Sequence, residues 1–593
     1  MFDKLLILDN GGFPIYYGNP VDAVVYFKKM VNHVNSDESE CPTCGNVNPE
    51  QIFNIIESKV VDEYGNPTRF RKVSPSEWNK FYKDYIEAKQ DPVSPSPDNP
   101  ESTFNIPNRI KQFIVFCTRD VRSKLTNTQY MLINMLEAPV LAFILAYLIK
   151  FWNTDVSNKD GYVFRANENM PAYLFMSVVV ALFIGLTVAA EEIIRDRKIL
   201  KRESFLNLSR SSYLMSKITI MFVISAIQTL AFVLVGNSVL EINGMWGDYW
   251  LVLFTTSCFA NMLGLNISSA FNSAVTIYIL IPFLIIPQLL LSGVIVKFEK
   301  LNPDITSQST VPVAGEMMAS RLAFEALAVN QFKNNKYERQ FYKYDEMMSI
   351  ADFRKNYWIP HLRGKIDKCE NNSRNNINTP EQVSDITLIR SEISLDLVRL
   401  KELSIERKKI ATISGTLMSQ LETLEKKIAA IDPNKFGVDP ANDMRNYLNL
   451  VNSVYIKVFN SNSEARDKSI RDKNKTEVDK EAFVQLKNDY MNEALSDQVR
   501  NSNEFNKIIE QDGKLIQRAD PVFLEPFQSD MANSHFFAPR KKVFGRYFDT
   551  FWVNLCVLWG MSLTMAITLY FDLLRKLIDG LGNLFSRFSK KGN

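Results

Sequence analysis

One stretch of the chain, from Met170 to Lys217, constrains the fold more than any other. It opens with an apolar run at 171–190, PAYLFMSVVVALFIGLTVAA, which is long enough to cross a ~30 Å hydrocarbon core as a helix. A dense charged run, EEIIRDRKILKRE, occupies 191–203, and the next apolar run begins near 218. This order predicts a membrane helix, a short charged helix and a return to the membrane. The charged run is either a solvated juxtamembrane helix or a docking surface for a soluble protein, and its density and mixed sign favour docking.

Apolar windows alternate with long polar tracts, which is typical of a polytopic membrane protein with a large soluble part. The predicted fold is mostly α-helical, with a small α/β segment at the N-terminus, where two short apolar runs flank Gly11 and Gly12. We predict six membrane spans, at about 129–151, 171–190, 218–240, 249–270, 274–296 and 551–571. The formal charge of +3 is too small for this length to indicate a nucleic-acid partner.

Basic residues predict the orientation of the spans. They cluster before the first span, between the second and third, and after the sixth, which all fall on one side of the membrane. Both termini are therefore expected in the cytoplasm, and the insertion at 299–548 outside. Within the insertion, apolar residues recur at three- and four-residue steps, so we expect an antiparallel helical hairpin at 383–513 that could bind an external protein partner.

Motifs for catalysis are scarce. The sequence has no P-loop and three histidines, so neither an ATPase nor a histidine-based enzyme is expected on this chain. Cys41 and Cys44, with His33 nearby, form half of a zinc site, but structural zinc usually takes four ligands. The alternative, which we favour, is a turn with two reduced thiols. We therefore expect no metal and no bound cofactor.

Polar side chains inside the predicted spans are candidates for the transport path. Glu137 lies in the first span, where a carboxylic acid should face protein or water. It is either a substrate or proton contact or, as we favour, a contact between helices. Gln288 in the fifth span carries the same alternatives, and Pro282 and Pro287 should bend that span.

Several segments together resemble the ABCG-type exporters of the ABC-2 superfamily. The opening FDKLLILDNGGFPIYYGNPVDAVVYF resembles the end of their ATP-binding domain, and CGNVNPEQIFNIIE resembles its linker to the membrane half. QFIVFCTRDVRSK is similar to their connecting helix, and EEIIRDRKILKRESFLNLSRSSYLMSK to their coupling helix. SGVIV at 292–296 resembles the end of their fifth span, and SRLAFEAL at 320–327 the segment after the re-entrant turn. The ATPase core is missing, and the insertion is far longer than in that family.

The resemblance implies a domain order and site residues. The order is an ATP-binding tail and linker at 1–90, a Pro-rich linker at 91–108, a connecting helix at 109–125, spans one to five at 129–298, the insertion at 299–548, the sixth span at 549–575 and a basic tail at 576–593. The implied coupling residues are Glu191, Glu192, Arg195, Arg197, Arg202 and Glu203. Gln288, Val294 and Ile295 would line the path and form its valve.

The implied function is the permease part of an ABC exporter, truncated or split from its ATPase. It would work as a homodimer in the lipid membrane. A hydrophobic or amphipathic substrate is expected, and the bacterial inner membrane is the expected location. ATP and Mg²⁺ would bind to the ATP-binding domain of the complete transporter. The alternative is a non-transporting scaffold whose external hairpin recruits partners. Transport predicts that blocking the central cavity matters more than deleting 383–513, and the scaffold predicts the reverse.

Overall fold

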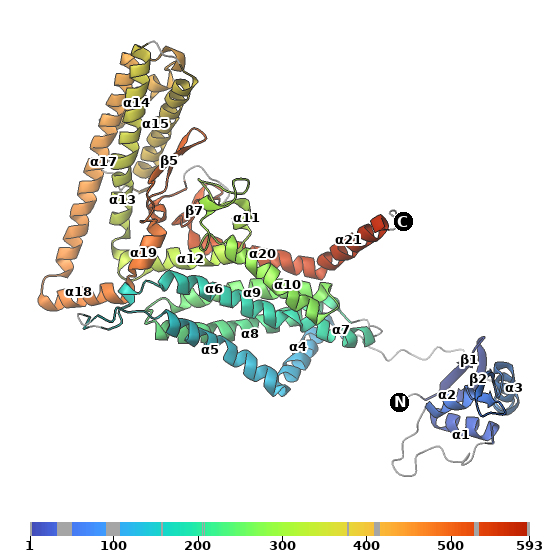
Figure 1. The fold of residues 1–593 in the computed structure, drawn as a ribbon. Coiled ribbons are helices and arrows are strands. Elements are labelled where there is room, and N and C mark those ends of the chain that lie inside the picture. The colour runs from blue at the N-terminus through green and yellow to red at the C-terminus, as the bar shows by residue number, and fades with distance from the viewer. Residues whose placement is uncertain are drawn as a thin grey trace. The chain divides into compact units, whose positions relative to one another are not determined.

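The computed structural model describes residues 3–32, 50–90, 107–155, 158–159, 161–203, 206, 208–375, 379–407, 415–526 and 533–589. The chain divides into two compact units, Met1–Asn105 and Ile106–Asn593 (Figure 1). The predicted zinc ligands His33, Cys41 and Cys44 lie outside the described residues.

The first unit is a small α/β body. Its elements are β1 (Leu5–Asp9), β2 (Phe13–Gly18), α1 (Pro20–Met30), α2 (Glu50–Ile56), β3 (Lys59–Val61), β4 (Pro67–Arg71), α3 (Pro75–Tyr85) and η1 (Glu87–Lys89). The two short apolar runs that flank Gly11 and Gly12 form a hairpin, since β1 and β2 pair antiparallel. Gly11 and Gly12 both have positive φ, which the tight turn requires and glycine supplies at little cost. Buried Phe27 and Trp78 pack edge to face in its core.

The second unit is built on a helical bundle that combines apolar helices with one amphipathic and one charged helix. They are α4 (Arg109–Thr126), α5 (Thr128–Ile149), α6 (Met170–Ala190), α7 (Glu192–Arg202), α8 (Arg210–Val239), α9 (Trp246–Ala270), α10 (Ala274–Leu290) and α20 (Thr550–Tyr570). Among the described residues, five helical segments are long and apolar enough to cross a membrane, and they contain α5, α6, α8, α9 and α20. This finding supports an integral membrane protein.

The predicted fifth span is shorter in the structure than the pattern suggested. The apolar helix α10 has 17 residues and ends at Leu290. The chain then turns through Gly293, whose φ is +76° and whose missing Cβ would lie 2.5 Å from the Phe298 ring. A side chain there would be strained and would clash, so the continuous apolar run at 274–296 divides into a helix and a turn.

Close helix packing holds the centre of the bundle together. α9 packs against α6, α8 and α20. A Cβ at Gly185 of α6 would lie 2.5 Å from the Ser257 carbonyl oxygen, and one at Gly264 of α9 would lie 2.9 Å from the Leu186 carbonyl oxygen. Small residues that let two helix backbones approach are the usual basis of helix association in membranes.

The insertion forms a helical arm and its base (Figure 1). The arm is the helical bundle at 359–473, and the base comprises the other elements of the insertion. Its helices are α11 (Val313–Glu316), α12 (Ala319–Asn334), α13 (Tyr342–Phe353), α14 (Ile359–Arg374), α15 (Pro380–Arg407), α16 (Gly415–Ala429), α17 (Val438–Lys473), α18 (Glu477–Tyr490) and α19 (Glu493–Arg500). Short turns of helix lie at η4 (Phe298–Lys300), η5 (Glu338–Gln340), η6 (Arg354–Trp358), η7 (Pro433–Lys435) and η8 (Pro521–Phe523), and a further turn, η2 (Phe164–Ala166), lies outside the insertion between α5 and α6. Two hairpins, β5 (Ile508–Gln511) with β6 (Lys514–Gln517) and β7 (Arg540–Val543) with β8 (Arg546–Asp549), complete it.

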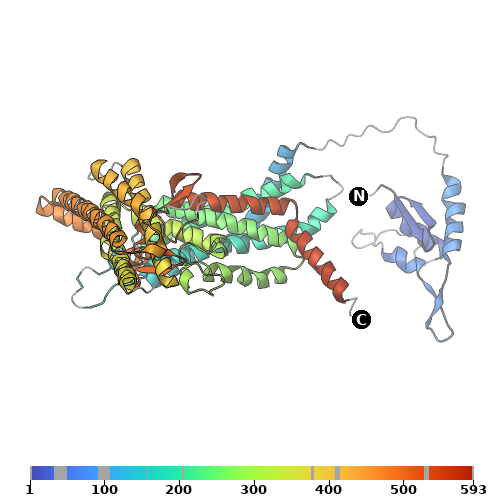
Figure 2. The same ribbon diagram turned by 90° about the horizontal axis from the view of Figure 1, so that it is seen from above.

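The arm is a bundle and not the two-helix hairpin that the periodicity suggested. α14 packs against both α15 and α17, and α16 lies between α15 and α17. Ile389 and Ile393 of α15 share one buried core with Leu362 of α14 and Val451 of α17. Figures 1 and 2 show the arm at one end of the second unit and α7 at the other.

A buried ionic cluster joins the base of the arm to the membrane helices. Glu325 of α12 accepts hydrogen bonds from Lys541 Nζ at 2.9 Å, Arg321 Nη1 at 2.9 Å and Asn554 Nδ2 at 2.8 Å. Burial alone would raise the pKa of Glu325, but Lys541 and Arg321 together lower it, so the carboxylate keeps its charge. The cluster connects α12, β7 and α20.

Candidate functional site

The charged segment that follows α6 is held by a side chain from α9. α7 begins at Glu192, and its first turn has backbone N–H groups with no partner inside the helix. Ser268 Oγ accepts hydrogen bonds from Ile193 N at 3.0 Å and Ile194 N at 3.1 Å. Arg197 donates to the Ser269 carbonyl oxygen at 2.8 Å. The start of α7 is thus fixed to the end of α9.

A buried ionic cluster, which we call the elbow cluster, joins α4, α7 and α8. Lys217 Nζ lies 2.7 Å from Asp120 Oδ1, 3.0 Å from Glu192 Oε2 and 2.9 Å from Asp196 Oδ2. Lys124 Nζ lies 2.6 Å from Asp120 Oδ2 and 2.8 Å from Glu192 Oε2. The side chains of Lys217 and Glu192 are each only 2% exposed, so neither is available to bind a soluble partner directly.

The elbow cluster favours the ionised form of Asp120. Burial alone would raise the pKa of Asp120, but the charges of Lys217 and Lys124 outweigh it and lower that pKa. Paired charges of both signs interact strongly away from water, and removal of one partner leaves the others uncompensated. We therefore expect α4, α7 and α8 to move as one body.

The predicted coupling residues divide into buried and exposed groups. Glu191 caps the end of α6, and Glu192 is buried in the elbow cluster. Arg195 pairs with Glu192 at 3.3 Å, and Glu203 pairs with Arg119 of α4 at 3.0 Å. Arg202 and its neighbour Lys198 are exposed, so the surface open to a partner is smaller than the charge run suggested.

The residues predicted for the transport path lie in different surroundings. Glu137 is half-buried in α5 and forms no ion pair with another residue in the described part of the chain. Gln288 Oε1 accepts a hydrogen bond from Ser320 N at 3.0 Å, so its side chain holds the first turn of α12. Ile295 is exposed, whereas Val294 lines a cavity. The structure therefore brings Val294 to a cavity wall without bringing all four residues together.

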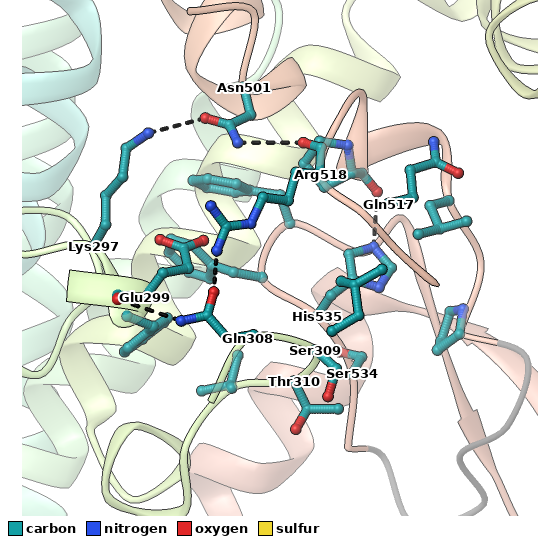
Figure 3. Close-up of a pocket in the computed structure, with 18 of the residues that line it drawn as sticks. Lys297, Glu299, Gln308, Ser309, Thr310, Asn501, Gln517, Arg518, Ser534 and His535 are labelled. Carbon is teal, nitrogen blue, oxygen red and sulfur yellow. Dashed lines mark hydrogen bonds between the residues drawn. The ribbon is translucent and has the colours of Figure 1, made fainter. Parts of the chain in front are cut away.

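That cavity lies between the turn after α10, the base of the arm and the β5–β6 hairpin (Figure 3), with a volume of about 1280 Å³. Lys297 Nζ donates to Asn501 Oδ1 at 3.0 Å, and Asn501 Nδ2 donates to the Arg518 carbonyl oxygen at 3.2 Å. The Arg518 guanidinium donates to Gln308. Charged, amide and aromatic side chains share the wall, so the cavity suits a molecule with polar groups.

Sequence reasoning missed the partners inside the elbow cluster. In the sequence, Lys124 and Lys217 are basic residues that help to predict the orientation of the spans, and Lys217 also ends the segment that resembles the coupling helix. No motif in the sequence includes Asp120 as a site residue. An i, i+4 pair of Asp120 and Lys124 is visible in the sequence, but such pairs are ordinary on exposed helices. Among the described residues, no group of three or more His, Cys, Asp or Glu side chains could hold a metal ion.

These observations define the class of protein, a polytopic helical membrane protein in which a short charged helix, α7, connects two candidate spans. Residues 111–331 match the family model described as ABC-2 type transporter, so this part of the chain is an ABC-2 type transporter membrane domain. The matched region runs from α4 to α12 and includes the whole elbow cluster. No curated protein matches the sequence.

The base of the arm contains a pair of acidic residues that gives a pH prediction. Burial and then the charge of Asp345 raise the pKa of Glu338 to about 7, and Arg466 lies 2.7 Å from Asp345. A carboxyl group whose pKa is higher in the folded state contributes to stability through its protonated form. This contribution is complete below pH 4.5, the ordinary pKa of the group, and is lost as the pH rises through about 7. We expect Glu338→Gln to raise the free energy of unfolding above pH 7 by roughly 1–3 kcal/mol. Melting curves across the pH range check this, and an equal effect at every pH would contradict it.

Proposed function

We propose that this chain is the permease part of an ABC exporter and that α7 receives motion from an ATP-binding domain or subunit. The observation that supports this most is the elbow cluster, which connects α7 to α4 and α8 inside an ABC-2 type transporter membrane domain. A solvated helix at the membrane surface would pair its charges with water, whereas here three carboxylates form ion pairs with the buried Lys217.

The arrangement of helices suggests how the motion would travel. α6 starts beside α19 of the arm base and ends at α7. A displacement of α7 would therefore move a helix that reaches the other end of the bundle, near the cavity lined by Val294. In this proposal ATP closure in a homodimer shifts α4, α7 and α8 together, and the far ends of α6 and α10 open or close the path.

The proposed substrate is amphipathic, with export as the direction and the bacterial inner membrane as the location. The cavity supports a polar part in the substrate, because Arg518, Lys297 and Glu299 lie on its wall. Apolar helices supply the route for a hydrophobic part. ATP and Mg²⁺ would be bound by the partner domain, and this chain would carry out no catalysis.

A charge reversal on α7 tests the proposal. Arg202 is exposed, so Arg202→Glu should leave the free energy of unfolding within about 0.5 kcal/mol of wild type. It should weaken coupling, because the reversed charge would face the ATP-binding subunit. The measurement is the labelling rate of Ser309→Cys, on the cavity wall, with and without ATP in the reconstituted complex.

We expect ATP to change the labelling rate at least several-fold in the wild-type background and not in Arg202→Glu. Glu481→Lys, on the exposed surface of α18, is the matched reversal and should leave the response intact. A second pair of variants separates docking from folding. Glu203→Arg should weaken the response by breaking the link to Arg119, and Arg119→Glu with Glu203→Arg should restore it. An unchanged response in Arg202→Glu would refute the role of α7.

A further inference from the structure

The last helix of the chain, α21 (Leu573–Ser589), begins three residues after the end of α20, the last candidate span. Asp572 makes the turn between them with a φ of 50° and forms an ion pair with Arg210 at 2.5 Å. Arg210 is the first residue of α8. The start of α21 is thus fixed at the end of the bundle that carries the charged elbow, where a span leaves the hydrocarbon.

α21 is amphipathic along its length. Its apolar residues recur at three- and four-residue steps: Leu573, Leu574, Leu577, Ile578, Leu581, Leu584, Phe585 and Phe588. For the residues whose side chains the structure describes, up to Leu581, this spacing places them on one face of the helix. Leu573, Leu577 and Leu581 are 46%, 59% and 47% exposed, whereas Leu574 packs against the core of the bundle. The side of this face that carries Leu573, Leu577 and Leu581 is therefore open within the described part of the chain.

The charge of the same segment indicates what covers that face. From 573 to the C-terminus the sequence has five basic residues, Arg575, Lys576, Arg587, Lys590 and Lys591, and one acidic residue, Asp579. A helix with an apolar face and a basic polar face binds in the plane of a bilayer that contains anionic lipid. Since α21 continues directly from a candidate span, the exposed leucines of its apolar face begin next to the bilayer.

We propose that α21 lies in the interface of the membrane that α20 crosses, with its leucines among the acyl chains and its basic residues on anionic lipid headgroups. The inference depends on the membrane domain and not on ATP coupling. Through Asp572 and Arg210, the docked helix would hold the start of α8, which carries Lys217 of the elbow cluster.

The test uses the full chain in vesicles of phosphatidylcholine alone or mixed with phosphatidylglycerol. A photo-reactive amino acid replaces Leu577 on the apolar face or, as the matched control, Asp579 on the polar face. Mass spectrometry identifies the adducts. We expect acyl-chain adducts at position 577 and few at position 579, with a higher yield in the anionic vesicles.

Arg575→Gln with Lys576→Gln should reduce the anionic preference about fivefold for each basic residue removed. These residues are exposed, so the fold should be unaffected. Adducts from position 577 to a second copy or to an ATP-binding subunit would overturn the proposal. Equal yields in both kinds of vesicle would overturn the assignment of the basic residues to anionic headgroups.

Discussion

Lys217→Met should destabilise the membrane domain by roughly 3–5 kcal/mol, because it leaves buried carboxylates without their shared cation. Lys217 Nζ is within 3.0 Å of Asp120, Glu192 and Asp196, and its side chain is 2% exposed. Lys124 still contacts two of these carboxylates, so the cluster would retain more negative than positive charge. The measurement is the melting midpoint of the purified protein in detergent.

Two controls separate the ionic effect from a general effect of the substitution. Lys198→Met changes an exposed lysine of α7 and should alter stability by at most about 0.5 kcal/mol. Glu192→Gln added to Lys217→Met should recover part of the loss, since it removes one uncompensated charge. Equal melting midpoints for Lys217→Met and Lys198→Met would show that the elbow cluster does not hold α7.

The second large effect is expected at the base of the arm. Glu325→Leu leaves Arg321 and Lys541 buried without their common anion, and breaking such a group usually costs about 3–5 kcal/mol. The Phe537 backbone N–H, 3.2 Å from Glu325 Oε1, would also lose its acceptor. We expect a lower melting midpoint and faster proteolysis near β7, because the cluster joins β7 to α12 and α20.

Glu481→Gln is the matched control for this variant, since Glu481 lies on the exposed surface of α18. It should melt like the wild type. Arg321 would still pair with Glu316, whereas Lys541 would have lost its ion-pair partner. Lys541→Met added to Glu325→Leu should therefore recover part of the stability. Wild-type melting of Glu325→Leu would contradict the account of how the arm is attached.

Local patterns in the sequence were sufficient for the helices of the membrane domain. The change from apolar residues to EEIIRDRKILKRE located the end of α6 and the whole of α7. The connecting helix that the resemblance implied at 109–125 corresponds to α4, which ends at Thr126. These features depend on composition and spacing along one segment, so one sequence contains them.

Contacts between distant segments could not be predicted in the same way. Asp120 and Lys217 are 97 positions apart, and nothing local indicates that they meet. The apolar period of α15 predicted a helix, but a period does not state how many helices pack against it, so Leu362 of α14 went unrecognised as part of the arm core. In the fifth apolar run, the continuous hydropathy predicted one span and did not indicate the turn that Gly293 permits.

The sequence also could not predict which charged side chains of α7 are exposed. A run of charged residues does not indicate which side chains are buried, so the sequence did not distinguish Glu192 from Arg202. The structure separates them, because Glu192 points into the elbow cluster while Arg202 remains exposed. The proposed coupling role therefore involves two parts, an inner set of residues that fixes the elbow and an outer set that would meet the partner.

The central claim is that motion enters at the elbow on one side of the membrane and that the arm lies on the other side. Labelling with a membrane-impermeant thiol reagent tests it most directly, with single cysteines at Lys198→Cys on α7 and Val478→Cys on α18 and with the six native cysteines replaced. Both positions are exposed. We predict that Val478→Cys reacts in intact cells and that Lys198→Cys reacts only when the cytoplasmic face is opened. Reaction of both positions from the same side would contradict the account.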